Sequence, residues 1–389
     1  MINKVIYINY QPITSKYYSD YYIDKCIENG IDVEYWDVSK WYFPEVVFNS
    51  DFDFKNIIYI KSSKEFKKQL SIQVLGSTFF VTNITYEFRA IKLFLDLSSL
   101  NCKKAFFARG MHPLPETAKS RKLSKIILSF NFRKLLVVIE NRIALLMKKV
   151  NLVKPYDYIF RAGSSGGLTI GYGSDYDLGF GKIREINYFD YDKYQTIDNS
   201  ELLIEGKYCL FIDQYLASHP DIAICGLENV NPKQYYFELN NYFDYIELKY
   251  RVTVVIAAHP KAVDYITSNP FFGRKIVFNK TCELVKDAEF VMTHHSTAIS
   301  FPILFKKPII FLNSLEIKRA MPFLYDLTNF LANYLNTEVV DLNNFEDNKE
   351  LNLNVNLEIY NNYKYKFLTS KESESQLTSD IFIKTLLSL

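Results

Sequence analysis

The sequence predicts an α/β protein built from two domains, each with a parallel sheet covered by helices. Short β-branched and aromatic runs alternate with helical stretches through both halves of the 389-residue chain, which is typical of βαβ units. A polar, weakly patterned stretch, residues 195–206, separates the halves. We therefore expect a first Rossmann-like domain over residues 1–195 and a second over residues 207–389, a length that suits two ordinary domains.

The individual elements follow from these runs. In the first half we expect strands at 4–10, 31–38, 56–62, 79–84, 103–109 and 156–163, and helices at 16–29, 63–72, 86–100 and 119–149. In the second half we expect strands at 207–213, 251–258, 275–279, 290–294, 308–312 and 337–342, and a helix at 231–250. The last 40 residues have a helical pattern.

The composition is that of a protein with an ordinary core. Hydrophobic residues make up 48% and charged residues 23%, and the net charge of +2 gives no nucleic-acid coat. The five cysteines show no metal-ligand spacing, which favours reduced thiols in the cytoplasm. The N-terminus lacks a signal-peptide pattern and no apolar run is long enough to span a bilayer. We expect a cytoplasmic protein.

The first polar cluster follows the strand at 251–258. His259, Pro260 and Lys261 stand where a strand gives way to a helix, and ligands of open α/β sheets bind at such strand ends. An imidazole can donate a hydrogen bond to a phosphate oxygen or act as a general acid. A histidine that merely caps the strand end is the alternative.

The second cluster follows the strand at 290–294. His294 and His295 are followed by Ser296 and Thr297, whose hydroxyls precede a helical run. Such hydroxyls cap a helix, and a helix N-terminus attracts phosphate. An ordinary cap without a ligand is the alternative, and His295 is also compatible with a packed histidine. Together with His259, these residues predict a phosphate site.

Two acids are candidates for the carboxylate of such a site. Asp213 ends the strand at 207–213, and Glu87 follows the strand at 79–84. A carboxylate there can act as a base, a nucleophile or a hydroxyl ligand, although Asp213 is equally compatible with a turn residue.

A glycine- and serine-rich turn follows the strand at 156–163. Gly163 and Ser164 open it, and glycine lets the backbone approach a ligand closely. The turn lacks the spacing of a dinucleotide fingerprint or a P-loop, so a plain loop is the alternative. Three Asp-x-Asp strings also occur, at 51–53, 175–177 and 190–192. They are too short to support a metal site, and we assign none.

The expected helix at 119–149 is strongly basic. It contains nine Lys and Arg residues and one acid, Glu140, interspersed with apolar residues. A basic amphipathic helix suits an anionic membrane surface; packing on its own domain is the alternative.

The second half resembles bacterial GT-B glycosyltransferases that use CMP-activated acidic sugars, such as sialyltransferases and Kdo transferases. His259-Pro260 looks like their HP motif, and Ser296-Thr297 looks like their paired hydroxyl motif, followed by a helix and a Lys-Pro-led strand. The resemblance covers about residues 207–314, and the first half matches in architecture alone. It implies that His259, Ser296 and Thr297 contact the phosphate of CMP.

This resemblance implies a transferase that moves a nonulosonic-type sugar to a lipopolysaccharide or capsule acceptor. It requires no bound cofactor or metal, and the CMP-sugar is the donor substrate. The enzyme would work at the inner face of the bacterial membrane. The acidic motif of the sialyltransferases has no clear copy here, which leaves Asp213 and Glu87 to be tested. Alternatives are a GT-B transferase with a UDP-sugar or CDP-polyol donor, and a non-catalytic nucleotide-binding protein.

Overall fold

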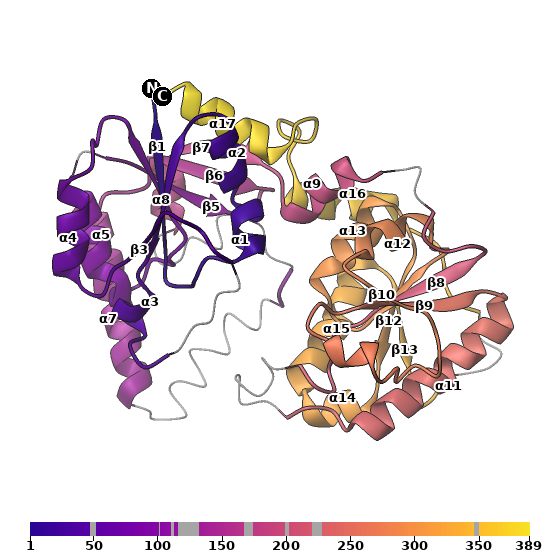
Figure 1. Cartoon of the computed structure of the whole chain (residues 1–389). Coiled ribbons are helices and arrows are strands. Elements are labelled where there is room, and N and C mark those ends of the chain that lie inside the picture. Colours follow the sequence, from indigo (N-terminus) through magenta and orange to yellow (C-terminus); the bar gives the residue numbers. More distant parts are fainter. Residues whose placement is uncertain are drawn as a thin grey trace. The chain divides into compact units, whose positions relative to one another are not determined.

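The chain folds into two compact units (Figure 1). The computed structural model describes residues 1–46, 52–100, 102–109, 113–115, 132–166, 174–198, 202–219, 228–345 and 350–389, without the side chains of 132–135 and 174. Of the described residues, the first unit contains 1–109, 132–189 and 365–389, and the second unit contains 113–115 and 190–364.

The first unit is built on a seven-stranded, wholly parallel sheet of order β3-β2-β1-β4-β5-β6-β7. Its strands are β1 (Lys4–Asn9), β2 (Asp32–Asp37), β3 (Ile57–Tyr59), β4 (Thr78–Thr82), β5 (Lys103–Ala108), β6 (Tyr158–Ala162) and β7 (Lys182–Ile186). Its helices before the crossover are α1 (Ser15–Asp20), α2 (Ile23–Glu28), α3 (Ser39–Tyr42), α4 (Ser63–Ser71), η1 (Phe88–Ala90), α5 (Ile91–Ser98), α7 (Phe132–Lys149) and α8 (Ser174–Phe180). The strand β7 was not expected. The expected helix at 16–29 is divided, because Tyr22 has a φ of 60°.

Alternation along the strands gives this sheet a core on each face. On β1, Ile6 and Ile8 pack with residues of α4 and α5, whereas Val5 and Tyr7 pack on the opposite face with residues of α2. Successive side chains of a strand point to opposite faces. A parallel sheet covered on both faces therefore has strands that are apolar at nearly every position, as these are.

The second unit contains a six-stranded parallel sheet of order β10-β9-β8-β11-β12-β13. Its strands are β8 (Tyr208–Ile212), β9 (Thr253–Ala258), β10 (Ile276–Phe278), β11 (Val291–Thr293), β12 (Ile309–Asn313) and β13 (Glu338–Asp341). Its helices are α9 (Phe189–Thr196), α11 (Pro232–Tyr250), η3 (Val263–Ile266), α12 (Thr281–Asp287), η4 (Thr297–Ile299), α13 (Ser300–Leu304), α14 (Leu315–Ala320), α15 (Pro322–Leu335) and α16 (Leu357–Tyr363). All six expected strands are present.

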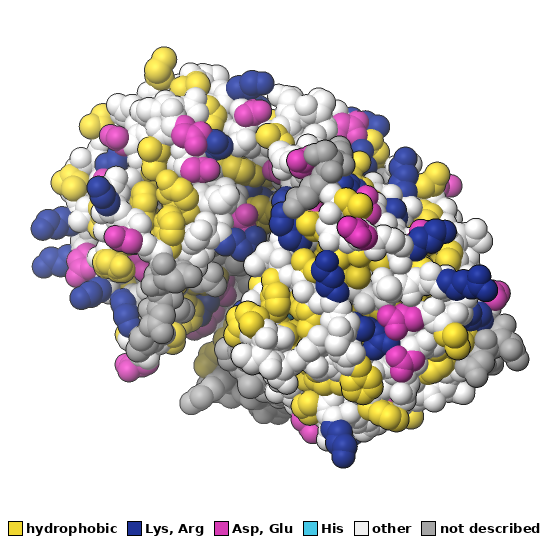
Figure 2. Space-filling model, turned by 45° about the vertical axis from the view of Figure 1, so that its right-hand side comes forward, with side chains coloured by type: hydrophobic (Ala, Val, Ile, Leu, Met, Phe, Trp, Pro, Cys, Tyr) yellow, Lys and Arg dark blue, Asp and Glu magenta, His cyan; other side chains and the backbone are white. Residues whose placement is uncertain are grey.

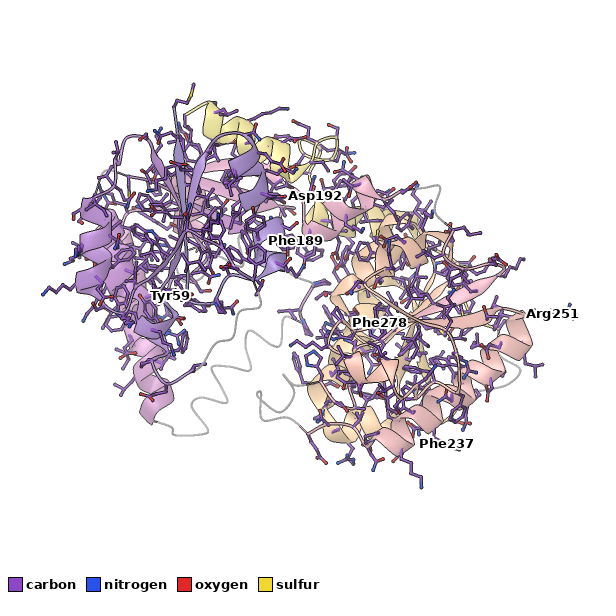
Figure 3. The ribbon with its side chains drawn as sticks, in the orientation of Figure 1. Tyr59, Phe189, Asp192, Phe237, Arg251 and Phe278 are labelled. Atoms are coloured by element: carbon purple, nitrogen blue, oxygen red, sulfur yellow. The ribbon has the colours of Figure 1, made fainter. Side chains whose placement is uncertain are left out.

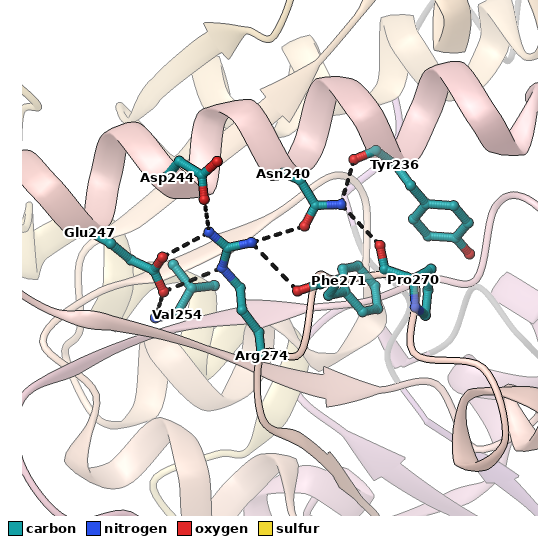
Figure 4. Close-up of polar contacts among 8 residues, drawn as sticks. All are labelled: Tyr236, Asn240, Asp244, Glu247, Val254, Pro270, Phe271 and Arg274. Carbon is teal, nitrogen blue, oxygen red and sulfur yellow. Dashed lines mark hydrogen bonds and ion pairs between the residues drawn. The ribbon is translucent and has the colours of Figure 1, made fainter.

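An arginine fixes the loop before β10 to α11. Arg274 forms ion pairs with Asp244 (2.5 Å) and Glu247 (2.7 Å), and its Nη1 donates to the Asn240 side chain at 2.9 Å (Figure 4). Glu247 also accepts from the backbone N–H of Val254 at 2.8 Å. The guanidinium therefore joins the loop to α11, and Glu247 joins α11 to the start of β9.

The division into units differs from the expected boundaries at both ends of the second domain. The chain passes between units at Phe189, at the start of α9 (Figure 3), before the expected linker at 195–206. The C-terminal segment, with η5 (Lys364–Leu368) and α17 (Thr378–Leu387), returns to the first unit. Phe382 of α17 lies in the same core as Phe107 and Phe160, so burial of this apolar face explains the return.

The expected fold class is confirmed: two Rossmann-like units with parallel sheets, the architecture of a GT-B-like fold, and helices at the C-terminal end. Lys and Arg side chains are interspersed with Asp and Glu on the face drawn in Figure 2. No helix in the described part of the chain combines the length and apolar character needed to cross a bilayer.

Candidate functional site

The strand order of the second sheet creates a switch point between β8 and β11. From β8 the chain moves to β9 and β10 on one side, and it then returns to β11 on the other side of β8. The loops that leave β8 and β11 therefore diverge, and ligands of open α/β sheets bind in the crevice outside such strand ends. The two polar clusters expected from the sequence lie at this edge.

A cavity of 310 Å³ occupies this position. It is lined by Gln214, Leu216, His219, His259, His295, Ser296, Thr297, Met321, Phe323 and Leu324. Its volume is within the range of small-molecule sites. The structure thus brings His259 together with His295, Ser296 and Thr297, as the sequence predicts. None of the described residues that line the cavity carries a carboxylate, so an anion meets no repulsive side chain among them.

A hydrogen bond closes the switch point. The backbone N–H of His295 donates to Oε1 of Gln214 at 2.7 Å. This bond joins the loop after β11 to the loop after β8. Burial lowers the pKa of the half-buried His295 imidazole to about 4, so His295 is neutral at physiological pH and can act as a neutral hydrogen-bond donor.

The position of the proton on His259 follows from its hydrogen bond. Nδ1 of His259 accepts from the backbone N–H of Lys261 at 3.2 Å. In the neutral ring the proton then lies on Nε2. The ring of His219 contacts the ring of His259 edge-on, with 4.7 Å between the centroids. Two imidazoles from different loops thus lie together on one wall.

Ser296 caps the short helical turn that follows it. Its Oγ accepts from the backbone N–H of Ala298 at 3.2 Å, so the ordinary-cap alternative describes this hydroxyl, although it also lines the cavity. Thr297 is exposed. Pro260 and Lys261 are exposed beside His259 and are not part of the cavity wall.

His294 is a structural residue. It is fully buried, and its Nδ1 donates to the carbonyl oxygen of Leu312 at 2.7 Å. Its Nε2 therefore accepts from the hydroxyl of Tyr235 at 2.9 Å. Burial lowers the pKa of His294 to about 4, so this ring is a neutral link between β12 and α11.

Asp213 is buried and is not among the residues that line the cavity. It is 3% exposed, and its carboxylate accepts from the backbone N–H of Tyr215 at 3.0 Å and from the hydroxyl of Tyr265 at 3.1 Å. Burial raises its pKa to about 6, against the effect of these bonds and of a backbone bond from His259. The carboxylate therefore joins the loops after β8 and β9, which is a positioning role.

The other expected site residues lie in the first unit. Glu87 accepts from Nε of Arg89 at 3.0 Å. Gly163 has a φ of +63°, and the backbone N–H of Ser164 donates to the carbonyl oxygen of Tyr365 at 3.2 Å. The glycine-rich turn thus holds the C-terminal segment, and its described contacts are structural.

Sequence reasoning missed His219. The signal was present, because His219 precedes a proline and follows β8 closely, just as His259 precedes a proline after β9. The Asp-x-Asp strings have other roles where they are described: Asp177 pairs with Lys148 and Asp190 accepts from Ser300. Among the described residues, no group of three or more His, Cys, Asp or Glu side chains has the arrangement of a metal site.

Comparisons with known proteins give similarity in structure alone. No protein-family model matches the chain, and no curated protein matches it either. The chain is similar to the UDP-GlcNAc 2-epimerase from Methanocaldococcus jannaschii, with 13% identity, a TM-score of 0.44 and coverage of 100% of both chains. It is also similar to an H444N variant of the wall teichoic acid polymerase TagF, with 13% identity and a TM-score of 0.48 over 99% of this chain and 89% of that one. A UDP-GlcNAc 2-epimerase from Neisseria meningitidis bound to UDP-GlcNAc has 10% identity and a TM-score of 0.39, over 99% and 100%.

Proposed function

We propose that the chain is a transferase that takes a group from a nucleotide-activated donor and binds the donor's phosphate in the cavity at the β8–β11 switch point. One observation carries this proposal: three histidines and two hydroxyl residues from three loops line the same cavity. Leaving-group departure places negative charge on phosphate. Hydrogen-bond donors aimed at that charge lower the barrier because they act most strongly as it develops.

His259 is the residue we assign to the leaving phosphate. The bond that Nδ1 accepts from Lys261 holds the neutral ring with its proton on Nε2, which is a donor for a phosphate oxygen. His295 is a second neutral donor, and Gln214 fixes its backbone. The group that activates the acceptor lies outside the described walls of this cavity, with Glu87 of the first unit still a candidate.

For the donor we favour a UDP-sugar or a CDP-polyol over the CMP-activated acidic sugar that the sequence resemblance implies. The cavity offers three imidazoles, one amide and two hydroxyls, which are enough hydrogen-bonding groups for a diphosphate. Transfer to a surface-glycan acceptor such as lipopolysaccharide or capsule remains part of the proposal.

A thermal-shift panel with UDP, CDP, CMP and GDP tests this assignment, because a ligand that binds the native state raises the unfolding temperature. We expect UDP or CDP to stabilise the wild type and to lose that effect in His259→Ala. Stabilisation by CMP alone would restore the CMP-sugar donor. If no nucleotide stabilises the protein, the proposal is wrong.

Turnover is measured separately as nucleotide released from each donor. A protein that binds a nucleotide but releases none from any UDP-, CDP- or CMP-linked donor, with or without glycan acceptors, would be a nucleotide-binding protein without catalysis.

A further inference from the structure

Helix α7 packs on the first unit through a face that combines polar and apolar side chains. Among its described side chains Asn141, Ala144 and Lys148 are buried, and they lie on one face because they are three and four residues apart. The backbone N–H of Phe88 donates to Oδ1 of Asn141 at 2.9 Å, and the hydroxyl of Tyr86 donates to the carbonyl oxygen of Ala144 at 2.7 Å. Hydrogen bonds therefore hold the inner face of this helix.

A buried ion pair completes the inner face. Nζ of Lys148 pairs with the carboxylate of Asp177, and both side chains are almost fully buried. The same ammonium lies 3.8 Å from the ring centre of Tyr86. Removing one partner of such a pair leaves an uncompensated buried charge, so this contact fixes the rotation of α7 about its axis.

The opposite face is apolar and open. Ile139, Ile143, Leu146 and Val150 follow one another at intervals of four, three and four residues, and each is between 44% and 58% exposed. This spacing places them in one stripe, which we call the α7 stripe. A surface helix normally buries such a stripe, so its exposure on α7, on the first unit (Figure 1), marks a candidate interaction surface.

The charge around the stripe identifies the kind of partner. Arg142 and Lys149 are exposed beside it. Residues 119–131, which precede the helix in the sequence, contain four Lys and Arg residues and no acidic residue. A second copy of the chain would bring like charges together, whereas an anionic lipid surface attracts them. We propose that the α7 stripe docks on an anionic lipid surface, with its apolar side chains in the boundary between headgroups and acyl chains.

The proposed docking is inferred from α7 alone, whereas the role that we give to it rests on the proposed function. A transferase that builds a surface glycan on a lipid-linked acceptor meets that acceptor at a membrane. The stripe belongs to the first unit and the residues that line the phosphate cavity belong to the second, so docking uses no residue of the cavity wall.

Vesicle co-sedimentation of the full chain tests the proposal. We expect binding to vesicles that contain phosphatidylglycerol and little binding to pure phosphatidylcholine, with the affinity falling as salt is added. Ile143→Gln with Leu146→Gln removes apolar area but keeps good helix formers. Arg142→Gln with Lys149→Gln removes charge, and each lost cation is expected to weaken binding by roughly fivefold.

Leu248→Gln is the matched control, because Leu248 is an 83% exposed apolar residue of α11 in the second unit. It should bind vesicles like the wild type. Unchanged binding of both double variants would overturn the proposal. So would a dimer in sedimentation equilibrium that the Ile143/Leu146 variant dissociates, which would assign the stripe to a second copy.

A lower unfolding temperature in the Ile143/Leu146 variant without loss of vesicle binding would instead show that the chain itself covers the stripe, and would also overturn the proposal. Nucleotide binding is measured on the same samples. If the protein binds vesicles but no nucleotide, the proposed function is wrong and the docking stands. If it binds a nucleotide but no vesicles, the docking is wrong and the proposed function stands.

Discussion

Gln214 and His295 are joined across the switch point of the second sheet by a 2.7 Å hydrogen bond from the His295 backbone to the Gln214 side chain. This bond connects loops that leave neighbouring strands in different directions. In Gln214→Leu the shape of the side chain is nearly kept but the acceptor is lost. A partly buried N–H left without a partner costs about 1–3 kcal/mol, which favours displacement of the loop after β11 from the cavity. We therefore expect the Kd for the nucleotide to rise by about tenfold, as measured by titration calorimetry.

Gln234→Leu is the control for this substitution. Gln234 lies on α11 and donates to Glu238 at 2.9 Å, away from the cavity walls. It should leave the nucleotide Kd unchanged. Equal Kd values for Gln214→Leu and the wild type would mean that the crossing bond does not shape the cavity.

His259 is expected to contribute most to turnover. Loss of one donor to a developing oxyanion typically costs ~10²–10³ in kcat, so His259→Ala should lose about that much. His259→Gln restores an N–H donor without an imidazole, and we expect it to recover part of the loss if His259 acts as a neutral donor. If kcat at saturating donor is no higher in His259→Gln than in His259→Ala, proton transfer by the ring is favoured instead.

Sequence patterns predicted the strands and the cavity well because both depend on local chemistry. The apolar runs that became β8, β9 and β11 identified their own carboxyl ends, and His259 and Ser296 follow two of those ends directly. Their meeting in one cavity follows from the strand order, with β8 between β9 and β11. The alternation of β and α elements predicted parallel strands, and their order is known only from the structure.

Contacts between distant segments were out of reach. Nothing local to Asp213 shows that the hydroxyl of Tyr265 would donate to its carboxylate. The turn at Gly163 has the composition of a ligand loop, yet it binds a segment about 200 residues further along the chain. The return of α17 to the first unit likewise depends on the burial of Phe382 in a core formed by earlier strands.

Two buried groups at the site are expected to make stability depend on pH in opposite directions. Burial raises the pKa of Asp213 from 3.8 to about 6, so the native state binds the extra proton and this contribution to stability falls as pH rises through that window. Burial lowers the pKa of His294 from 6.5 to about 4. There the unfolded state binds the extra proton, and this contribution rises over nearly the same window.

Urea unfolding of variants between pH 4 and 7 separates the two contributions. Asp213→Asn removes the contribution that falls as pH rises. Between pH 4 and pH 6 the free energy of unfolding of this variant, relative to that of the wild type, should therefore increase by about 3 kcal/mol. His294→Gln removes the contribution that rises with pH, so its free energy of unfolding relative to the wild type should decrease over the same range. Asp380→Asn, an exposed carboxylate of α17, controls for the loss of one charge. Parallel curves for all four proteins would contradict the burial of charge at both positions.

The turn at Gly163 is expected to hold the C-terminal segment by close backbone contact. A Cβ at Gly163 would lie 2.6 Å from the carbonyl oxygen of Lys366, and the φ of +63° disfavours any side chain. Gly30→Ala is the matched control, because Gly30 has a φ of +72° in the same unit with nothing within 4 Å of its Cβ position. Both variants carry the cost of the backbone conformation, of order 1–3 kcal/mol, and Gly163→Ala alone adds the clash.

Gly163→Ala should therefore lower the free energy of unfolding more than Gly30→Ala and speed proteolysis within residues 364–389. If the two variants lose equal stability and resist protease equally, the turn does not anchor this segment.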